Sequence, residues 1–352
     1  MRSQEERKIY VSDEPSFSQR LNDILNTLIP KLRLEGSIDL KNSDPQIAKS
    51  INFKLSNNCS ICVFDKSDEA LINDFEDISK EKLLLWKSYG INRLSIGVQS
   101  LNNEQLKWMN RSHIAEQNIQ SIMLAKSLGF QNISIDLIYG LPNMTNKEWS
   151  NQLYTIKDWG IQHISAYCLT VEKKTALMHY VNSKKVIMPG EEKQIEQFKI
   201  LCDRLNEFGF EQYEISNFSK PNHRALHNSS YWNRESYIGI GPSAHSFSGN
   251  KRRWNVANNK KYLDCSLRET DWYEEEELTP KDEWNELILT KLRTSDGVNK
   301  GELKNIGELT NSFYSKVNSF IELEWVNEKP NSYVLTLEGR LRADYIASEL
   351  FK

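Results

Sequence analysis

The sequence predicts an α/β protein from about residue 85 onward, in which part of a (β/α) barrel is followed by a small α+β domain. Three observations support this fold class: a fourfold repeat of helix, glycine and strand, polar residues where the repeated strands end, and a change of pattern near residue 283. Units of about 30 to 50 residues are typical of parallel sheets covered by helices.

The repeat becomes visible when the chain is aligned on four glycines that each end a helical stretch. These glycines are Gly90, Gly129, Gly160 and Gly209. Glycine is the usual left-handed residue just past a helix end. Each is followed by one apolar residue, two polar residues and an apolar–small–apolar alternation that predicts a buried strand. No GxGxxG motif follows these strands, which favours part of a (β/α) barrel over a doubly wound sheet.

Two helices between the strands can also be predicted. Thr145 and Glu148 form a capping box at the start of the first helix. In the second helix, apolar residues fall on one face; they are Ile195, Phe198, Leu201, Cys202, Leu205 and Phe208. We therefore expect Cys202 to lie in the core.

Polar residues mark the ends of the predicted strands, where (β/α) barrels bind ligands and carry out chemistry. These residues are Gln99, Asp136, Tyr167, Thr170, Glu214 and Asn217. Asp136 stands out, because a carboxylate inside the apolar run ISIDLIYG needs a hydrogen-bond or charged partner. A structural role for Asp136, such as capping a loop or binding a backbone amide, stays open.

The segment 223–258 is predicted to be a long functional loop, because it is dense in His, Trp, Tyr, Asn and Gly and has little helical periodicity. His227 and His245 are candidate metal ligands. Aromatic side chains that offer a flat surface to a planar ligand are Tyr231, Trp232 and Trp254. The alternative is that both histidines only donate hydrogen bonds within a packed loop.

The last segment, 283–352, is predicted to be a separate small domain. It contains a helix in EWNELILTKLRT, another near 311–323, a hairpin around EKPNS and a final helix. The predicted strands WVNE and YVLTL resemble the wing of a winged-helix module. Because the segment is not strongly basic, a docking or lid role is favoured over DNA binding.

Composition gives no reason to expect nucleic acid or anionic lipid as a partner. The 352-residue chain has a formal net charge of -3, and charges of both signs are spread along it. Its first residues are too polar for a secretory signal, and no apolar stretch approaches the roughly 18 residues of a membrane span. The five cysteines have no framework spacing and are expected to be reduced. We expect a cytoplasmic protein.

Eight segments occur in a characteristic order: GINRLSIGVQS, NRSH, ISIDLIYGLP, HISAYCLTVE, YEISNFSKP, HNSSYW, GIGPSAHSF and RRWNVANN. In this order and spacing they closely resemble the heme chaperone HemW family. That family is a relative of oxygen-independent coproporphyrinogen III dehydrogenase within the radical S-adenosylmethionine (radical SAM) superfamily. The resemblance runs from about residue 76 to residue 352, with too many ordered motifs for a chance agreement.

The resemblance implies an incomplete (β/α) barrel of radical SAM type over 76–282 and the family's small C-terminal domain over 283–352. Carried over by motif, the residues that would contact S-adenosylmethionine are Gln99 of GVQS, Arg111 of NRSH and Asp136 of SIDLIYGLP. An amide, a guanidinium and a carboxylate suit the carboxylate, amine and ribose hydroxyls of that cofactor.

The resemblance also implies heme binding. His227, in HNSSYW, matches the motif proposed to bind heme, and imidazole is the commonest protein ligand of heme iron. Tyr231 and Trp232 would flank the porphyrin. The family is thought to hand heme to acceptor proteins such as respiratory enzymes, which makes it a carrier more than a catalyst. Any membrane association would be transient and would occur through those acceptors.

Residues 1–75 break the family's pattern. Radical SAM proteins begin with a CxxxCxxC loop that holds a [4Fe–4S] cluster, whereas this segment has only Cys59 and Cys62, two thiolates where three are needed. We interpret both as strand or loop residues and expect no cluster cysteines. The family's GGGTP loop is missing too, since Gly36 is the only glycine before Gly90. A frameshift or wrong start would explain so sharp a boundary.

Three functions follow as alternatives. The first is a heme carrier whose cluster-dependent step is impaired or lost, and it needs only His227 and the C-terminal half. The second is a radical SAM enzyme similar to oxygen-independent coproporphyrinogen III oxidase, against which the missing cysteines weigh heavily. The third is an inactive remnant of the family. The sequence favours the carrier and assigns no catalytic residue.

Overall fold

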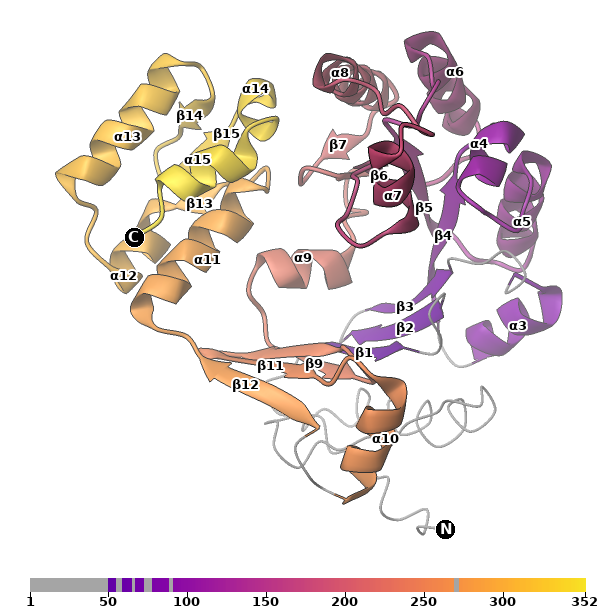
Figure 1. Cartoon of the computed structure of the whole chain (residues 1–352), viewed down its shortest axis with the longest axis horizontal. Coiled ribbons are helices and arrows are strands. Elements are labelled where there is room, and N and C mark those ends of the chain that lie inside the picture. Colours follow the sequence, from indigo (N-terminus) through magenta and orange to yellow (C-terminus); the bar gives the residue numbers. More distant parts are fainter. Residues whose placement is uncertain (1–49, 55–58, 65–66, 73–77, 89–90, 269–271) are drawn as a thin grey trace. The chain divides into compact units, whose positions relative to one another are not determined.

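The computed structural model describes residues 50–54, 59–64, 67–72, 78–88, 91–268 and 272–352 (Figure 1). The chain divides into two compact units. Unit 2 comprises Ile72–Leu84 and Arg93–Ala225, and unit 1 comprises the remainder, including Leu226–Lys352. Gly36, on which the comparison with the GGGTP loop rests, and Gly90, the first glycine of the repeat, lie outside the described residues.

Unit 2 is built on the parallel strands that the glycine repeat predicts. They are β4 (Arg93–Gln99), β5 (Asn132–Tyr139) and β6 (His163–Cys168). Leu94 pairs with Ile133, and Ile135 pairs with Ile164, in parallel register. These three strands confirm the α/β class and the strands predicted to follow the first three glycines of the repeat.

Helices follow each of these three parallel strands. They are α4 (Asn103–Trp108), α5 (Ala115–Ser127), α6 (Asn146–Lys157), α7 (Ala176–Asn182) and α8 (Glu191–Glu207), and α3 (Lys80–Ser88) precedes β4. Gly129, Gly160 and Gly209 have φ angles of 89°, 60° and 76°, as expected for left-handed residues past helix ends. The capping box of Thr145 and Glu148 is present at the start of α6.

The core of unit 2 lies on one face of the three strands. Because side chains alternate along a strand, the odd-numbered residues of β5 share this face, and Ile133, Ile135 and Leu137 are fully buried. Trp149 of α6 is also fully buried and stacks on Tyr139 of β5, with ring centroids 5.7 Å apart. Helix α6 therefore covers the apolar face of the sheet.

The prediction that Cys202 lies in the core is wrong in part. Phe198, Leu201 and Leu205 of α8 are buried as expected, but Cys202 is half-buried at the margin of the stripe. Its Sγ lies 3.6 Å from Oε1 of Gln212, a polar neighbour that the helical pattern does not reveal.

The fourth unit of the repeat does not form a parallel strand, which corrects the prediction. After Gly209, β7 (Glu211–Gln212) has only two residues and pairs antiparallel with β8 (Asn217–Ser219). Strand β8 in turn pairs antiparallel with β6. A turn reverses the chain here, with the Gln212 side chain donating to the Ile215 carbonyl at 2.8 Å. The apolar alternation of YEIS does not distinguish this turn from a strand.

The strands before β4 and after β8 follow the order β12-β11-β10-β9-β1-β2-β3 in the 12-stranded sheet. The N-terminal members are β1 (Ser50–Lys54), β2 (Cys59–Phe64) and β3 (Ser67–Ile72). Strand β1 pairs antiparallel with β2 and parallel with β9. Cys59 and Cys62 thus belong to a strand, in agreement with their interpretation as strand or loop residues.

The segment 223–258 is not a long loop, which corrects a second prediction. It forms α9 (Leu226–Trp232), β9 (Tyr237–Ile240), β10 (His245–Ser248) and β11 (Lys251–Asn255). Strands β10 and β11 form an antiparallel hairpin, and β11 pairs with β12 (Tyr273–Glu277). Charged pairs such as Arg253–Glu275, 2.9 Å apart, stabilise these partly exposed strands, whose side chains lack the apolar alternation of a buried strand. Helix α10 (Asn259–Arg268) follows.

The C-terminal segment contains the predicted winged-helix elements. Its helices are α11 (Pro280–Leu292), α12 (Lys300–Ile306), α13 (Asn311–Glu322), α14 (Leu337–Arg340) and α15 (Ala343–Glu349). Its strands β13 (Val298–Asn299), β14 (Val326–Glu328) and β15 (Ser332–Leu335) form an antiparallel sheet. The hairpin of β14 and β15 is the predicted wing, although the predicted strand YVLTL ends at Leu335 and α12 and α14 were not predicted.

Nowhere in the part of the chain that the structure describes does a helix combine the length and the apolar character needed to cross a membrane.

Candidate functional site

The second face of β4, β5 and β6 is polar and forms the candidate site of unit 2. Ser95 of β4 lies beside Ser134 of β5, and Asp136 of β5 lies beside Ser165 of β6. The hydroxyl of Ser95 donates to Oδ1 of Asp136 at 3.3 Å. Asp136 is half-buried and lies inside β5, three residues before its end, so its predicted place at the strand end is wrong. Its position on the polar face satisfies the need for a polar partner.

A buried histidine that the sequence analysis missed occupies the centre of this face. His163 of β6 is 2% exposed, with Nδ1 2.7 Å from the Ser134 hydroxyl and Nε2 2.8 Å from the Tyr213 hydroxyl. Burial, together with the charge of Arg93, holds the pKa of His163 well below its ordinary value of 6.5. The imidazole is therefore neutral at physiological pH. The only sequence signal was a histidine at a strand position in GIQHISA.

Glu214, in the turn between β7 and β8, and Asn217, the first residue of β8, reach the same face. The Ser165 hydroxyl donates to Oδ1 of Asn217 at 2.7 Å, and the Asn217 amide donates to the Glu214 carboxylate. Both residues are buried, although neither ends a parallel strand. Tyr167 and Thr170, which were also predicted to mark strand ends, are exposed at and just beyond the end of β6.

Gln99 lies where the sequence predicts, at the carboxyl end of β4. It is buried and has a φ of 64°, an uncommon conformation for a residue with a side chain. It pairs with Leu137, one residue beyond Asp136. Arg111 is half-buried in the loop after α4, where its backbone N–H donates to the Leu106 carbonyl at 2.9 Å. Strained backbone at a strand end is a feature of binding sites.

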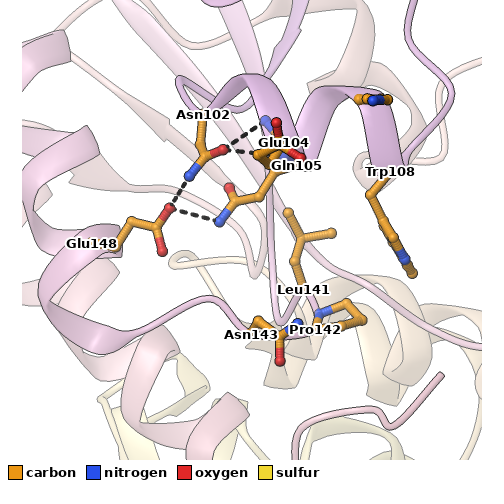
Figure 2. Close-up of a pocket in the computed structure, with 9 residues that line it drawn as sticks. Asn102, Glu104, Gln105, Trp108, Leu141, Pro142, Asn143 and Glu148 are labelled. Carbon is orange, nitrogen blue, oxygen red and sulfur yellow. Dashed lines mark hydrogen bonds between the residues drawn. The ribbon is translucent and has the colours of Figure 1, made fainter.

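A cavity of about 510 Å³ opens beside the loops that follow β4 and β5 (Figure 2). Its lining includes Trp108, Leu141 and Pro142. The Glu148 carboxylate accepts hydrogen bonds from the side chains of Asn102 at 2.5 Å and Gln105 at 2.9 Å. These hydrogen bonds join the N-terminus of α6 to that of α4. The three polar side chains therefore hold the two helices together.

In unit 1, the motif HNSSYW forms α9. His227 and Tyr231, one helical turn apart, are both half-buried, and the Tyr231 hydroxyl lies 2.9 Å from Nε2 of His227. Nδ1 of His227 is buried. The indole N–H of Trp232 is also buried and finds no acceptor among the described residues. A buried donor of this kind calls for an explanation, and a bound ligand is one.

The second histidine candidate fits a metal site poorly. His245 of β10 is exposed and lies opposite Trp254 of β11, whose indole donates to Glu274 at 3.1 Å. Within the described ranges, no three His, Cys, Asp or Glu side chains are grouped so that they could hold a metal ion.

The thiols do not fit a [4Fe–4S] cluster. The sequence has no CxxxCxxC motif. The cysteines with described side chains, Cys168, Cys202 and Cys265, lie in three separate elements, β6, α8 and α10. Burial raises the pKa of Cys168 to about 11, so this thiol is neutral and a poor metal ligand at physiological pH.

Comparison with known proteins identifies the family. The model of the Radical SAM superfamily matches residues 57–151. The "Heme chaperone HemW" of Bacillus subtilis is 30% identical over 348 residues, which cover 95% of this chain and 91% of that protein. The protein of the same name from Lactococcus lactis is 32% identical over 222 residues, which cover 63% and 58% of the two chains.

A solved structure supports the fold class. The radical SAM enzyme coproporphyrinogen III oxidase (HemN) from Escherichia coli superposes with a TM-score of 0.69 at 19% identity, over 82% of this chain and 70% of that chain. The α/β fold is therefore of the HemN-like radical SAM type, and the strands described here do not close into a barrel. With the near full-length match to the Bacillus subtilis protein, the chain belongs to the HemW heme chaperone family of the radical SAM superfamily.

Proposed function

We propose that this protein binds heme through His227 and hands it to acceptor proteins such as respiratory enzymes. The observation that supports this proposal most is the geometry of α9, where one short helix presents an imidazole and the indole of Trp232. The relatives from Bacillus subtilis and Lactococcus lactis carry the name heme chaperone. A cytoplasmic location is part of the proposal.

The chemistry of α9 suits a carried heme. A neutral imidazole nitrogen is a good ligand for heme iron, and His227 is half-buried, so a planar ligand can approach it. The buried indole N–H of Trp232 supplies a donor that a heme carboxylate can use. Tyr231 and Trp232 also provide apolar ring surface beside the imidazole. A single protein ligand favours a heme that can be given up.

Unit 2 supplies groups that suit S-adenosylmethionine. We propose that Gln99, Arg111 and Asp136 contact it, because Gln99 and Asp136 lie on neighbouring strands and Gln99 pairs with Leu137, the residue after Asp136. Asp136→Asn is expected to weaken binding of S-adenosylmethionine in calorimetry, whereas Asp158→Asn at the end of α6 leaves it unchanged. Equal affinities in both variants would remove Asp136 from the site.

The cluster-dependent step is proposed to be impaired or lost, because the chain lacks the three-cysteine motif. An enzyme similar to coproporphyrinogen III oxidase would need that cluster to cleave S-adenosylmethionine reductively. Detection of this cleavage in protein reconstituted under anaerobic conditions would favour the enzyme over the carrier. Failure of soluble protein to bind either ligand would favour an inactive remnant.

A heme titration of the purified protein, followed by visible absorption, tests the carrier function. Wild-type protein is expected to bind about one heme per chain, and His227→Ala is expected to lose this binding. His245→Ala is the matched control, since His245 is an exposed histidine of the same unit. Binding that is unchanged in His227→Ala, or equally reduced in both variants, would contradict the proposed ligand.

A further inference from the structure

The hydroxyl of Tyr231 is hydrogen-bonded to Nε2 of His227, the nitrogen that heme iron would bind. Nδ1 of His227 is buried, which leaves Nε2 for a ligand that approaches from outside. Nε2 lies 2.9 Å from the Tyr231 hydroxyl. If the hydroxyl donates, the Nε2 lone pair is engaged; if Nε2 carries the proton, it has no lone pair to offer. In either tautomer this hydrogen bond must break before iron can bind.

The ring of Tyr231 is held in place by other aromatic rings. Its centroid lies 4.8 Å from that of His227 at an interplanar angle of 81°, and 4.6 Å from that of Tyr237 at 83°. Tyr237 of β9 is in turn 6.2 Å from Phe247 of β10. Edge-to-face pairs of this kind restrain the ring. The hydroxyl is therefore presented to His227 by packing that does not depend on the hydrogen bond itself.

We propose that Tyr231 is a positioning residue that competes with heme iron for His227, so that heme is captured less tightly and released more readily. This inference rests on the proposed heme ligand. During capture, the imidazole gives up the tyrosine hydroxyl as it binds iron. During transfer, the hydrogen bond between the Tyr231 hydroxyl and Nε2 forms again as the iron leaves. The competing hydrogen bond lowers the free energy of the heme-free state, which suits a carrier that must pass its cargo on.

The test compares Tyr231→Phe with Tyr237→Phe in the full chain. Each variant keeps its ring and loses one hydroxyl, but only the Tyr231 hydroxyl contacts His227. Loss of one competing hydrogen bond is expected to tighten heme binding by about three- to tenfold in Tyr231→Phe and to speed heme association. Tyr237→Phe is expected to match wild type. A merely structural role for the hydroxyl would weaken binding instead.

A second measurement examines the heme-free protein. In long-range proton–nitrogen NMR spectra of the histidine rings, Tyr231→Phe is expected to shift the Nε2 resonance of His227, and Tyr237→Phe is expected to leave it in place. Heme affinity in Tyr231→Phe equal to or below wild type, an equal gain in Tyr237→Phe, or an unmoved Nε2 resonance would each overturn the inference. Undiminished heme binding by His227→Ala would instead overturn the proposed ligand, so the two failures are distinguishable.

Discussion

The parallel strands of unit 2 and the segment from α9 to β11 in unit 1 use their side chains differently. In β4 to β6, aliphatic residues such as Ile96 and Ile135 are fully buried against helices. In the segment Leu226–Asn255, aromatic and polar side chains such as Tyr231 and Trp232 are only half-buried. The first region contributes stability through apolar burial, and the second keeps groups that can bind a ligand within reach of solvent.

Replacing one tryptophan in each region gives the largest expected contrast. Trp149→Ala removes a fully buried ring and its hydrogen bond to the Gln197 carbonyl, and is expected to lower the free energy of unfolding by about 3–5 kcal/mol. Trp232→Ala removes a half-buried ring and is expected to cost about 1 kcal/mol. Urea denaturation measures both. Equal losses would show that the two regions do not differ as described.

Replacing Glu148 tests whether its hydrogen bonds to Asn102 and Gln105, beside the cavity, stabilise the fold. Glu148→Ala removes the capping box of α6 and the hydrogen bonds to Asn102 and Gln105, so unfolding is expected to become easier by about 1–2 kcal/mol. The adjacent exposed Lys147 supplies the control, since Lys147→Ala should change stability by about 0.5 kcal/mol or less. If both variants unfold alike, the network contributes little.

His163, on the polar face of unit 2, is expected to make the stability of the protein depend on pH. Its pKa is lowered in the folded protein, so the unfolded chain binds the proton more readily, and stability is lost as the pH falls below 6.5. Between pH 6.5 and 5.5 this loss is expected to be about 1 kcal/mol. His163→Gln should flatten that slope in urea denaturation, whatever its overall stability. An unchanged slope would mean that the pKa of His163 is not lowered in the folded protein.

The sequence predicted the elements whose signals are local. Gly129 and Gly160 marked two parallel strands, since glycine is the commonest left-handed residue just past a helix end. Thr145 and Glu148 marked the start of α6 for a similarly local reason, and WVNE and YVLTL marked the wing. The segment Leu226–Asn255 was mistaken for a loop because its strands are partly exposed and stabilised by pairs across strands, which leave no apolar period.

The sequence predicted which residues belong to the candidate site better than it predicted where they lie. Gln99 was placed correctly because it closes a buried strand, and Asp136 was recognised because a carboxylate in an apolar run is unusual. The contacts of His163 with Ser134 and Tyr213 join residues 29 and 50 positions apart, and no local pattern reveals them. The hydrogen bond between His227 and Tyr231 is local, but its geometry appears only once α9 is seen as a helix.

The central claim, a heme carrier without a cluster, is tested most directly by measuring heme, iron and acid-labile sulfide in one sample. The sample is protein reconstituted anaerobically with iron and sulfide and then loaded with heme. The account predicts about one iron per chain, all of it in heme, and no sulfide. Iron in excess of heme, accompanied by sulfide and by reductive cleavage of S-adenosylmethionine, would contradict it.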